Sequence, residues 1–205
     1  MRRGFLVYNP AAGGRDRTAQ IGVEGEGLRR EPPPYRPTTS LKPTLAWGLV
    51  ALVGRPVDAL LDPFAGGGTV LIEAAARWPG ARLHASDLHE RNVDGLRLNL
   101  PDAEVRAGDA RRLDEGWADR RFDAIVTNPP FGRRLGRGVD LEGLYRAFLR
   151  SAVAVTTEQA RIVVLAQRRG AFNRAIAGCG AWETRHVRIV EVGGLYAGAF
   201  VLARK

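Results

Sequence analysis

The sequence predicts a doubly wound α/β fold in which a mostly parallel sheet of seven strands ends in a C-terminal antiparallel hairpin. Strand-like runs alternate with helical patterns along most of the chain, which is typical of βαβ units and parallel strands. A glycine-rich turn follows the first of these strands, at the position where open α/β sheets bind ligands. Two final apolar runs are separated by Gly193 and Gly194, which favours a tight hairpin.

The first 37 residues are rich in Gly, Pro and Arg, so we expect residues 1–37 to form an N-terminal arm, loosely ordered or folded as a hairpin, before a domain over 38–205. The domain opens with a helix over 43–54, which has a proline in its first turn and a glycine at its end. The predicted strands cover 58–62, 81–86, 103–108, 122–127, 160–166, 183–192 and 195–204. The predicted helices between them cover 70–78, 90–100 and 141–155.

Composition limits the classes of protein to consider. A chain of 205 residues with 45% apolar content can form one domain with a substantial core. Its 31 basic and 22 acidic residues give a net charge of +9, which favours polyanionic partners such as nucleic acids. The single cysteine excludes an internal disulfide and a cysteine-based zinc cluster, and the three histidines lack metal-ligand spacing, so no metal is expected. Without a run of about 18 apolar residues, we expect no membrane association and a soluble cytoplasmic protein.

The glycine-rich turn, in the stretch LLDPFAGGGTVLIEAA, predicts a cofactor site. Gly66 and Gly68 match the start of the G-x-G-x-x-G dinucleotide fingerprint, but Leu71 stands at its third glycine. Asp62 directly precedes the turn, where it would repel a pyrophosphate and attract a cation. The pattern therefore favours a ligand with a positive end and no phosphate, and S-adenosylmethionine meets this description. An ordinary strand-to-helix turn is the alternative.

Two further aspartates follow the next two predicted strands. Asp87 comes about 20 residues after the glycines, where a carboxylate can accept the ribose hydroxyls of a nucleoside. Asp109 follows the third strand and could accept the adenine amine. Because parallel strands end at the same edge of a sheet, we expect both carboxylates beside the glycine turn.

A second motif, in the stretch FDAIVTNPPFGRR, follows the fourth predicted strand. Two consecutive prolines, Pro129 and Pro130, remove two backbone donors and stiffen the chain. Such a segment suits a site that must hold hydrogen-bond acceptors in a fixed direction. Arginines at 133, 134 and 137 follow it and could contact phosphates, or form a solvated charge cluster.

The stretches DPFAGGGT, SDLHERNVDGLRLN, AGDARRL and IVTNPPFG, in this order, resemble class I S-adenosylmethionine-dependent amino-methyltransferases with an (N/D)PP(F/Y) motif. More narrowly, SLKPTLAWGL followed by the glycine turn is similar to the methyltransferase domain of THUMP-associated RNA guanine-N2 methyltransferases. The resemblance runs from about Gly22 to the C-terminus. It implies a Rossmann-like class I fold over residues 38–205, and it adds to the cofactor site Phe64, Thr69, Leu88, Ala110 and Asn128.

The chemistry of amine methylation explains the second motif. An exocyclic amine of guanine or adenine is a weak nucleophile, because its lone pair is delocalised into the ring. The side-chain oxygen of Asn128 and the carbonyl of Pro129 could each accept one N–H and direct the lone pair towards the methyl group. Phe131 would stack on an extruded base.

The sequence thus predicts an enzyme that methylates an exocyclic amine of guanosine in structured RNA, with tRNA as the first and rRNA as the second substrate. The alternatives are an enzyme that methylates adenine in DNA and a catalytically inactive partner subunit with this fold. A separate base-recognition domain, which the DNA enzyme would need, is not visible in the sequence. An inactive subunit would be expected to carry a damaged glycine turn or NPPF motif. The sequence has no THUMP module, which normally precedes this domain in the family. A compact domain makes few phosphate contacts, so we expect RNA binding to depend on a separate RNA-binding domain or subunit.

Overall fold

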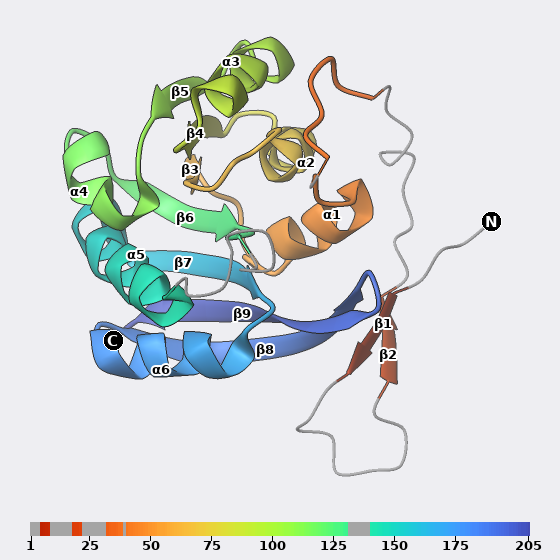
Figure 1. Ribbon diagram of the computed structural model, residues 1–205, viewed down its shortest axis with the longest axis vertical. Coiled ribbons are helices and arrows are strands. Elements are labelled where there is room, and N and C mark those ends of the chain that lie inside the picture. The colour runs from red at the N-terminus through yellow and green to blue at the C-terminus, as the bar shows by residue number, and fades with distance from the viewer. Residues whose placement is uncertain (1–4, 9–17, 22–31, 39, 131–139) are drawn as a thin grey trace.

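Five parallel strands lie next to one another and form one side of the sheet (Figure 1). The computed structural model describes residues 5–8, 18–21, 32–38, 40–130 and 140–205. In spatial order the parallel strands are β5 (Glu104–Ala107), β4 (Arg82–Asp87), β3 (Ala59–Asp62), β6 (Phe122–Thr127) and β7 (Thr156–Ala166). Their carboxyl ends share one edge of the sheet, as predicted.

An antiparallel hairpin continues the sheet beyond β7. Strand β9 (Leu195–Arg204) pairs with β7, and β8 (Trp182–Val192) pairs with β9. These seven strands confirm the predicted sheet and its C-terminal hairpin. Two short strands, β1 (Phe5–Tyr8) and β2 (Thr18–Ile21), pair with each other, and β1 adds to the edge of β8, so the described residues form a nine-stranded sheet.

Helices cover both faces of the sheet (Figure 1). Their bounds are α1 (Pro43–Ala51), α2 (Thr69–Arg77), α3 (Glu90–Asn99), the 3-10 turn η2 (Ala110–Arg112), α4 (Leu113–Gly116), α5 (Leu141–Val155) and α6 (Arg169–Cys179). Helices α1, α2 and α3 share one apolar cluster with the sheet, and α4, α5 and α6 share a second. The sheet is therefore doubly wound, with a core on each side.

Helix α5 shows how the sequence forms these layers. Asp140 caps its first turn by accepting a hydrogen bond from the backbone of Gly143 over 2.8 Å. Tyr145, Phe148 and Leu149 recur at helical spacing and are fully buried against the sheet. The observed bounds of α5 are those predicted from this periodicity.

Three elements were not predicted. The turn η2 and helix α4 have three and four residues, too few for a periodic pattern. Helix α6 does carry a signal, because its buried residues Phe172, Ala175 and Ile176 are three and four positions apart. Strand β7 begins at Thr156, four residues before its predicted start at 160. The sequence does not indicate this extension, because residues 156–159 are polar and two of them are exposed.

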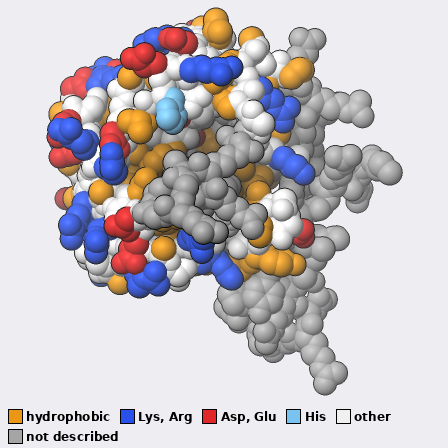
Figure 2. All heavy atoms as spheres, viewed as in Figure 1, with side chains coloured by type: hydrophobic (Ala, Val, Ile, Leu, Met, Phe, Trp, Pro, Cys, Tyr) orange, Lys and Arg blue, Asp and Glu red, His pale blue; other side chains and the backbone are white. Residues whose placement is uncertain are grey.

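Charged side chains of both signs are interspersed over the face seen in Figure 2. Ion pairs join some of the protein's opposite charges: Arg106 lies 3.0 Å from Asp119, and Arg120 lies 3.1 Å from Glu104. Within the described ranges, no helix is long and apolar enough to cross a membrane.

Candidate active site

The site begins at Asp62, the last residue of β3. Its side-chain oxygen Oδ1 accepts hydrogen bonds from the Thr127 hydroxyl over 2.6 Å and from the Phe64 backbone over 3.1 Å. Burial raises the pKa of Asp62 from 3.8 to about 7; the two hydrogen bonds oppose this rise, and the charge of Asp87 adds to it. Since only 1% of Asp62 is exposed, its observed role is to join β3 to the end of β6, and contact with a ligand stays a prediction.

The glycine turn after Asp62 is crowded on one side and open on another. Gly66 and Gly68 have φ angles of 55° and 82°, which other residues adopt only with strain. A side chain at Gly67 would come within 2.6 Å of Pro37, and one at Gly68 would come within 2.8 Å of Leu100. A side chain at Gly66 would meet no atom within 4 Å, so the turn leaves space for a ligand at this position.

Two more predicted residues flank this turn. Thr69 begins helix α2 directly after Gly68 and is half-buried. Phe64 is also half-buried, and its ring contacts Phe148 of α5 edge-on at a centroid distance of 5.6 Å. The structure thus places both beside the loop, with Phe64 anchored to the second core.

Asp87, at the end of β4, holds the turn from its neighbouring strand. One carboxylate oxygen accepts from the backbone of Gly66 over 2.9 Å. The other accepts from the backbone of His89 over 2.9 Å and from the side chain of Asn92 over 3.0 Å. Leu88 follows directly and is 64% exposed, so it presents an apolar surface beside the carboxylate.

Residues 32–38 and 40–42, called segment 32–42 below, pack across the glycine turn and α3, a contact that local sequence patterns do not report. The Tyr35 hydroxyl donates to the Asn92 side chain over 2.7 Å, and Asn92 in turn contacts Asp87. The Asn99 amide donates to the Tyr35 carbonyl over 2.7 Å and to the Gly67 carbonyl over 2.8 Å. Segment 32–42 therefore joins α3 to the glycine turn, and its residues up to 37 lie within the predicted N-terminal arm.

Asp109 lies beyond β5, and its carboxylate already accepts hydrogen bonds from within the chain. Its carboxylate accepts from the Arg111 backbone over 2.9 Å, which caps η2, and from the Arg111 guanidinium over 2.8 Å. The hydrogen bond from the Arg111 side chain is the main cause that lowers the pKa of Asp109. A bound adenine amine would have to share this carboxylate. Ala110, the next residue, is almost completely buried.

Asn128 and Pro129 follow directly after β6. The side-chain oxygen Oδ1 of Asn128 is buried and has no hydrogen-bond partner among the described residues. An unsatisfied buried acceptor costs about 1–3 kcal/mol, so this oxygen calls for a partner such as a ligand or a water molecule. Pro129 is buried, while Phe131 and the arginines at 133, 134 and 137 lie outside the described residues.

The structure thus places these groups along one edge of the sheet. Strand β3 lies between β4 and β6, so Asp62 is central, with Asp87 on one side and Asn128 on the other. Asp109 lies further out, after β5. In the part of the chain that the structure describes, no group of three or more His, Cys, Asp or Glu residues could hold a metal ion.

The sheet order β5-β4-β3-β6-β7-β9-β8, with a glycine turn after β3, defines the class I methyltransferase fold, whose members use S-adenosylmethionine. The chain belongs to the UPF0020 family, described as an RMKL-like methyltransferase domain, whose model matches residues 30–198.

Two relatives and one solved structure show the similarity in detail. A tRNA (guanine(6)-N2)-methyltransferase of Thermus thermophilus is 36% identical over 93% of this chain and 58% of its own length. The mouse tRNA (guanine(6)-N(2))-methyltransferase THUMP3 is 31% identical over 90% of this chain and 40% of its own length. The crystal structure of TrmN from Thermus thermophilus matches 82% of this chain and 50% of its own with a TM-score of 0.73 and 35% identity. The chain thus spans about half the length of these relatives.

The residues present fit S-adenosylmethionine. The stretch from Asp62 to Leu71 contains no Lys or Arg that would favour a phosphate, and the space at Gly66 adjoins the carboxylate of Asp87. Leu88 can cover one face of an adenine ring, and the acceptor Oδ1 of Asn128 lies at the neighbouring strand end. Which of these residues touch the cofactor stays a prediction.

Proposed function

We propose that this chain is a catalytic domain that transfers a methyl group from S-adenosylmethionine to the exocyclic N2 amine of guanosine in RNA, with tRNA as the first substrate and rRNA as the second. The family and the fold support methyl transfer. The names of the similar proteins support guanosine in tRNA.

The unsatisfied side-chain oxygen of Asn128 is the observation that carries the proposal. A guanine amine bound at the end of β6 would satisfy this acceptor with one N–H, and the Pro129 carbonyl would accept the other. Two fixed acceptors draw the amine out of the ring plane and direct its lone pair, and preorganised groups of this kind stabilise the transition state strongly.

The reaction itself needs little else from the protein. The amine nitrogen forms a bond to the methyl carbon as the carbon–sulfur bond breaks, and the nitrogen then releases one proton to solvent. Asp87 and the glycine turn would hold the cofactor's nucleoside in place during this step, and Phe131 would stack on the extruded base.

RNA binding in our proposal is shared with a separate RNA-binding domain or subunit. A small catalytic domain can neutralise only some of the 6 to 10 phosphates that give tight, strongly salt-dependent binding. The proposed place of action is the cytoplasm, in keeping with a single cysteine in the chain.

Identification of the product tests the proposal. The chain is incubated with S-adenosylmethionine carrying a labelled methyl group and with unmodified tRNA transcripts, and the RNA is digested to nucleosides for mass spectrometry. The expected product is labelled N2-methylguanosine. Label in N6-methyladenine of added DNA, with none in RNA, would assign the chain to a different substrate class.

A further inference from the structure

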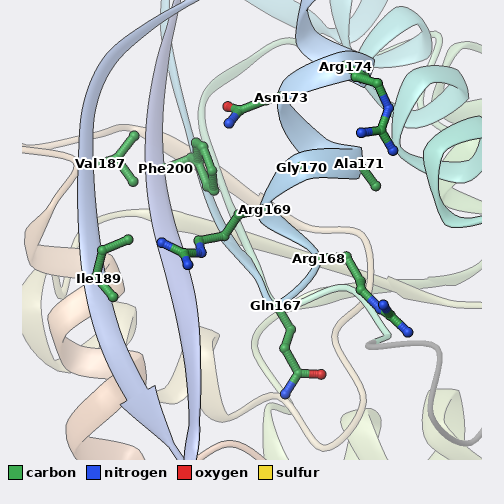
Figure 3. A pocket seen from close by; sticks show the side chains of 10 residues that line it. All are labelled: Gln167, Arg168, Arg169, Gly170, Ala171, Asn173, Arg174, Val187, Ile189 and Phe200. Atoms are coloured by element: carbon green, nitrogen blue, oxygen red, sulfur yellow. The ribbon is translucent and has the colours of Figure 1, made fainter.

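A cavity of about 670 Å³ lies between the start of α6 and strands β8 and β9 (Figure 3). Val187 and Ile189 of β8 and Phe200 of β9 line one side of it with apolar groups. In Figure 3, Arg169 extends from α6 towards these strands, whereas Arg168 points in the opposite direction from the same turn. The cavity therefore combines an apolar wall with a basic rim.

In the part of the chain that the structure describes, the charges of Arg168 and Arg169 are not compensated by acidic groups. Among the described residues, neither Arg168 nor Arg169 forms an ion pair, whereas Arg174 of the same cavity pairs with Glu142 at 2.7 Å. The first turn of α6 has no acidic residue and no side-chain cap. The amides at this helix start add a partial positive charge to the two guanidinium groups. A polyanion is the ligand that such a rim attracts.

The cavity lies at the same edge of the sheet as Asn128. Strands β6 and β7 run parallel, and Thr127 pairs with Val164. Asn128 and Gln167 therefore leave the ends of neighbouring strands, which in sheets lie about 4.8 Å apart. A nucleic acid with one base at Asn128 would carry its adjoining backbone past the turn from β7 to α6.

We propose that Arg168 and Arg169 bind the phosphodiester backbone of the RNA substrate next to the target nucleotide, with a sugar or base against the apolar wall of the cavity. The inference rests on the proposed function and deepens it, because it assigns a place on the domain to the substrate. The site lies on described elements, unlike the arginines at 133, 134 and 137 that the sequence suggested.

RNA affinity measured against salt tests this assignment. The variant Arg168→Ala/Arg169→Ala is compared with Arg82→Ala/Arg121→Ala. The second variant removes the same charge from exposed positions at the amino ends of β4 and β6, opposite the proposed site. A fluorescent unmodified tRNA transcript is the probe, and its dissociation constant is measured at several salt concentrations. Calorimetry with S-adenosylmethionine and circular dichroism check that each variant is folded.

The first variant is expected to bind the transcript about tenfold more weakly than the control and to lose about 0.7 units of salt slope for each phosphate contact. Arg168→Lys/Arg169→Lys keeps the charge and is expected to keep most of the slope. Equal RNA affinity and slope for the two Ala variants would overturn the inference, even if the wild type methylates RNA. Equal displacement of the transcript by polyglutamate and by unlabelled RNA would also overturn it, because it would show a site for any polyanion.

The test also separates this inference from the proposed function. The wild type could transfer no methyl group to RNA while only Arg168→Ala/Arg169→Ala binds RNA more weakly. This result would refute the proposed reaction and support the RNA site.

Discussion

The hydroxyl of Thr127 donates a hydrogen bond of 2.6 Å to the carboxylate of Asp62. Both residues are buried, and they end two neighbouring strands, β6 and β3. The residue after Thr127 is Asn128, and the residues after Asp62 form the glycine turn. This one contact thus links the segment proposed to hold the substrate amine with the loop proposed to hold the cofactor.

Replacement of Thr127 tests this link. Thr127→Val keeps the shape of the side chain but removes the donor, so Asn128 is expected to lose its fixed position. We expect kcat to fall about tenfold or more, with affinity for S-adenosylmethionine within a few-fold of the wild type. Thr127→Ser restores the donor and should recover most of kcat. A Val variant with wild-type kcat would show that the contact does not position Asn128.

The buried carboxyl of Asp62 should make stability depend on pH. Its pKa is about 7 in the folded chain against 3.8 ordinarily, so between these values the folded state binds more protons than the unfolded state. The free energy of unfolding should therefore fall as pH rises through this window, by up to about 1.4 kcal/mol per pH unit, and level off above it. Urea unfolding of the wild type and of Asp62→Asn, which lacks this titration, isolates the effect. Parallel pH profiles would contradict it.

Asp87→Ala should abolish binding of S-adenosylmethionine while the domain stays folded. The substitution removes the carboxylate proposed for the ribose hydroxyls and also releases the backbone of Gly66. Asp94→Ala is the matched control, because Asp94 lies on α3, is exposed and forms a surface ion pair with Arg97. Calorimetry measures both variants. Unaltered affinity in Asp87→Ala would remove Asp87 from the cofactor site.

Gly95→Ala should disturb the cofactor site from a distance. A side chain at Gly95 would overlap the ring of Tyr35, which must then move away from α3. We expect loss of the Tyr35–Asn92 hydrogen bond and a several-fold weaker affinity for S-adenosylmethionine. Gly116→Ala serves as control, because a side chain there meets no atom within 4 Å. Equal affinities would show that segment 32–42 does not support the site.

These contacts show which parts of the fold the sequence could predict. The bounds of α5 followed from local periodicity, and the places of Asp62, Asp87 and Asn128 followed from the rule that parallel strands end at one edge. The contact between Tyr35 and Asn92 joins residues 57 positions apart, and local patterns cannot report it. Gly95 in the middle of α3 is explained by this contact, because Ala is otherwise favoured in a helix and a side chain at Gly95 would overlap Tyr35.

The basic rim at α6 was missed for a different reason. Arginines are frequent throughout the chain, so the sequence does not show which of them lack acidic partners. The folded structure is needed to see that Arg106 and Arg174 have acidic partners, whereas Arg168 and Arg169 have none among the described residues.

The central claim is that the side-chain oxygen of Asn128 accepts a hydrogen bond from the amine being methylated. Single-turnover methylation of unmodified tRNA by Asn128→Ala, with calorimetry of cofactor binding, tests it most directly. The account predicts nearly complete loss of methyl transfer with cofactor affinity within a few-fold of the wild type, because the interaction strengthens mainly in the transition state. A variant that keeps more than about a tenth of wild-type kcat/KM, a loss of less than about 1.4 kcal/mol, would contradict it.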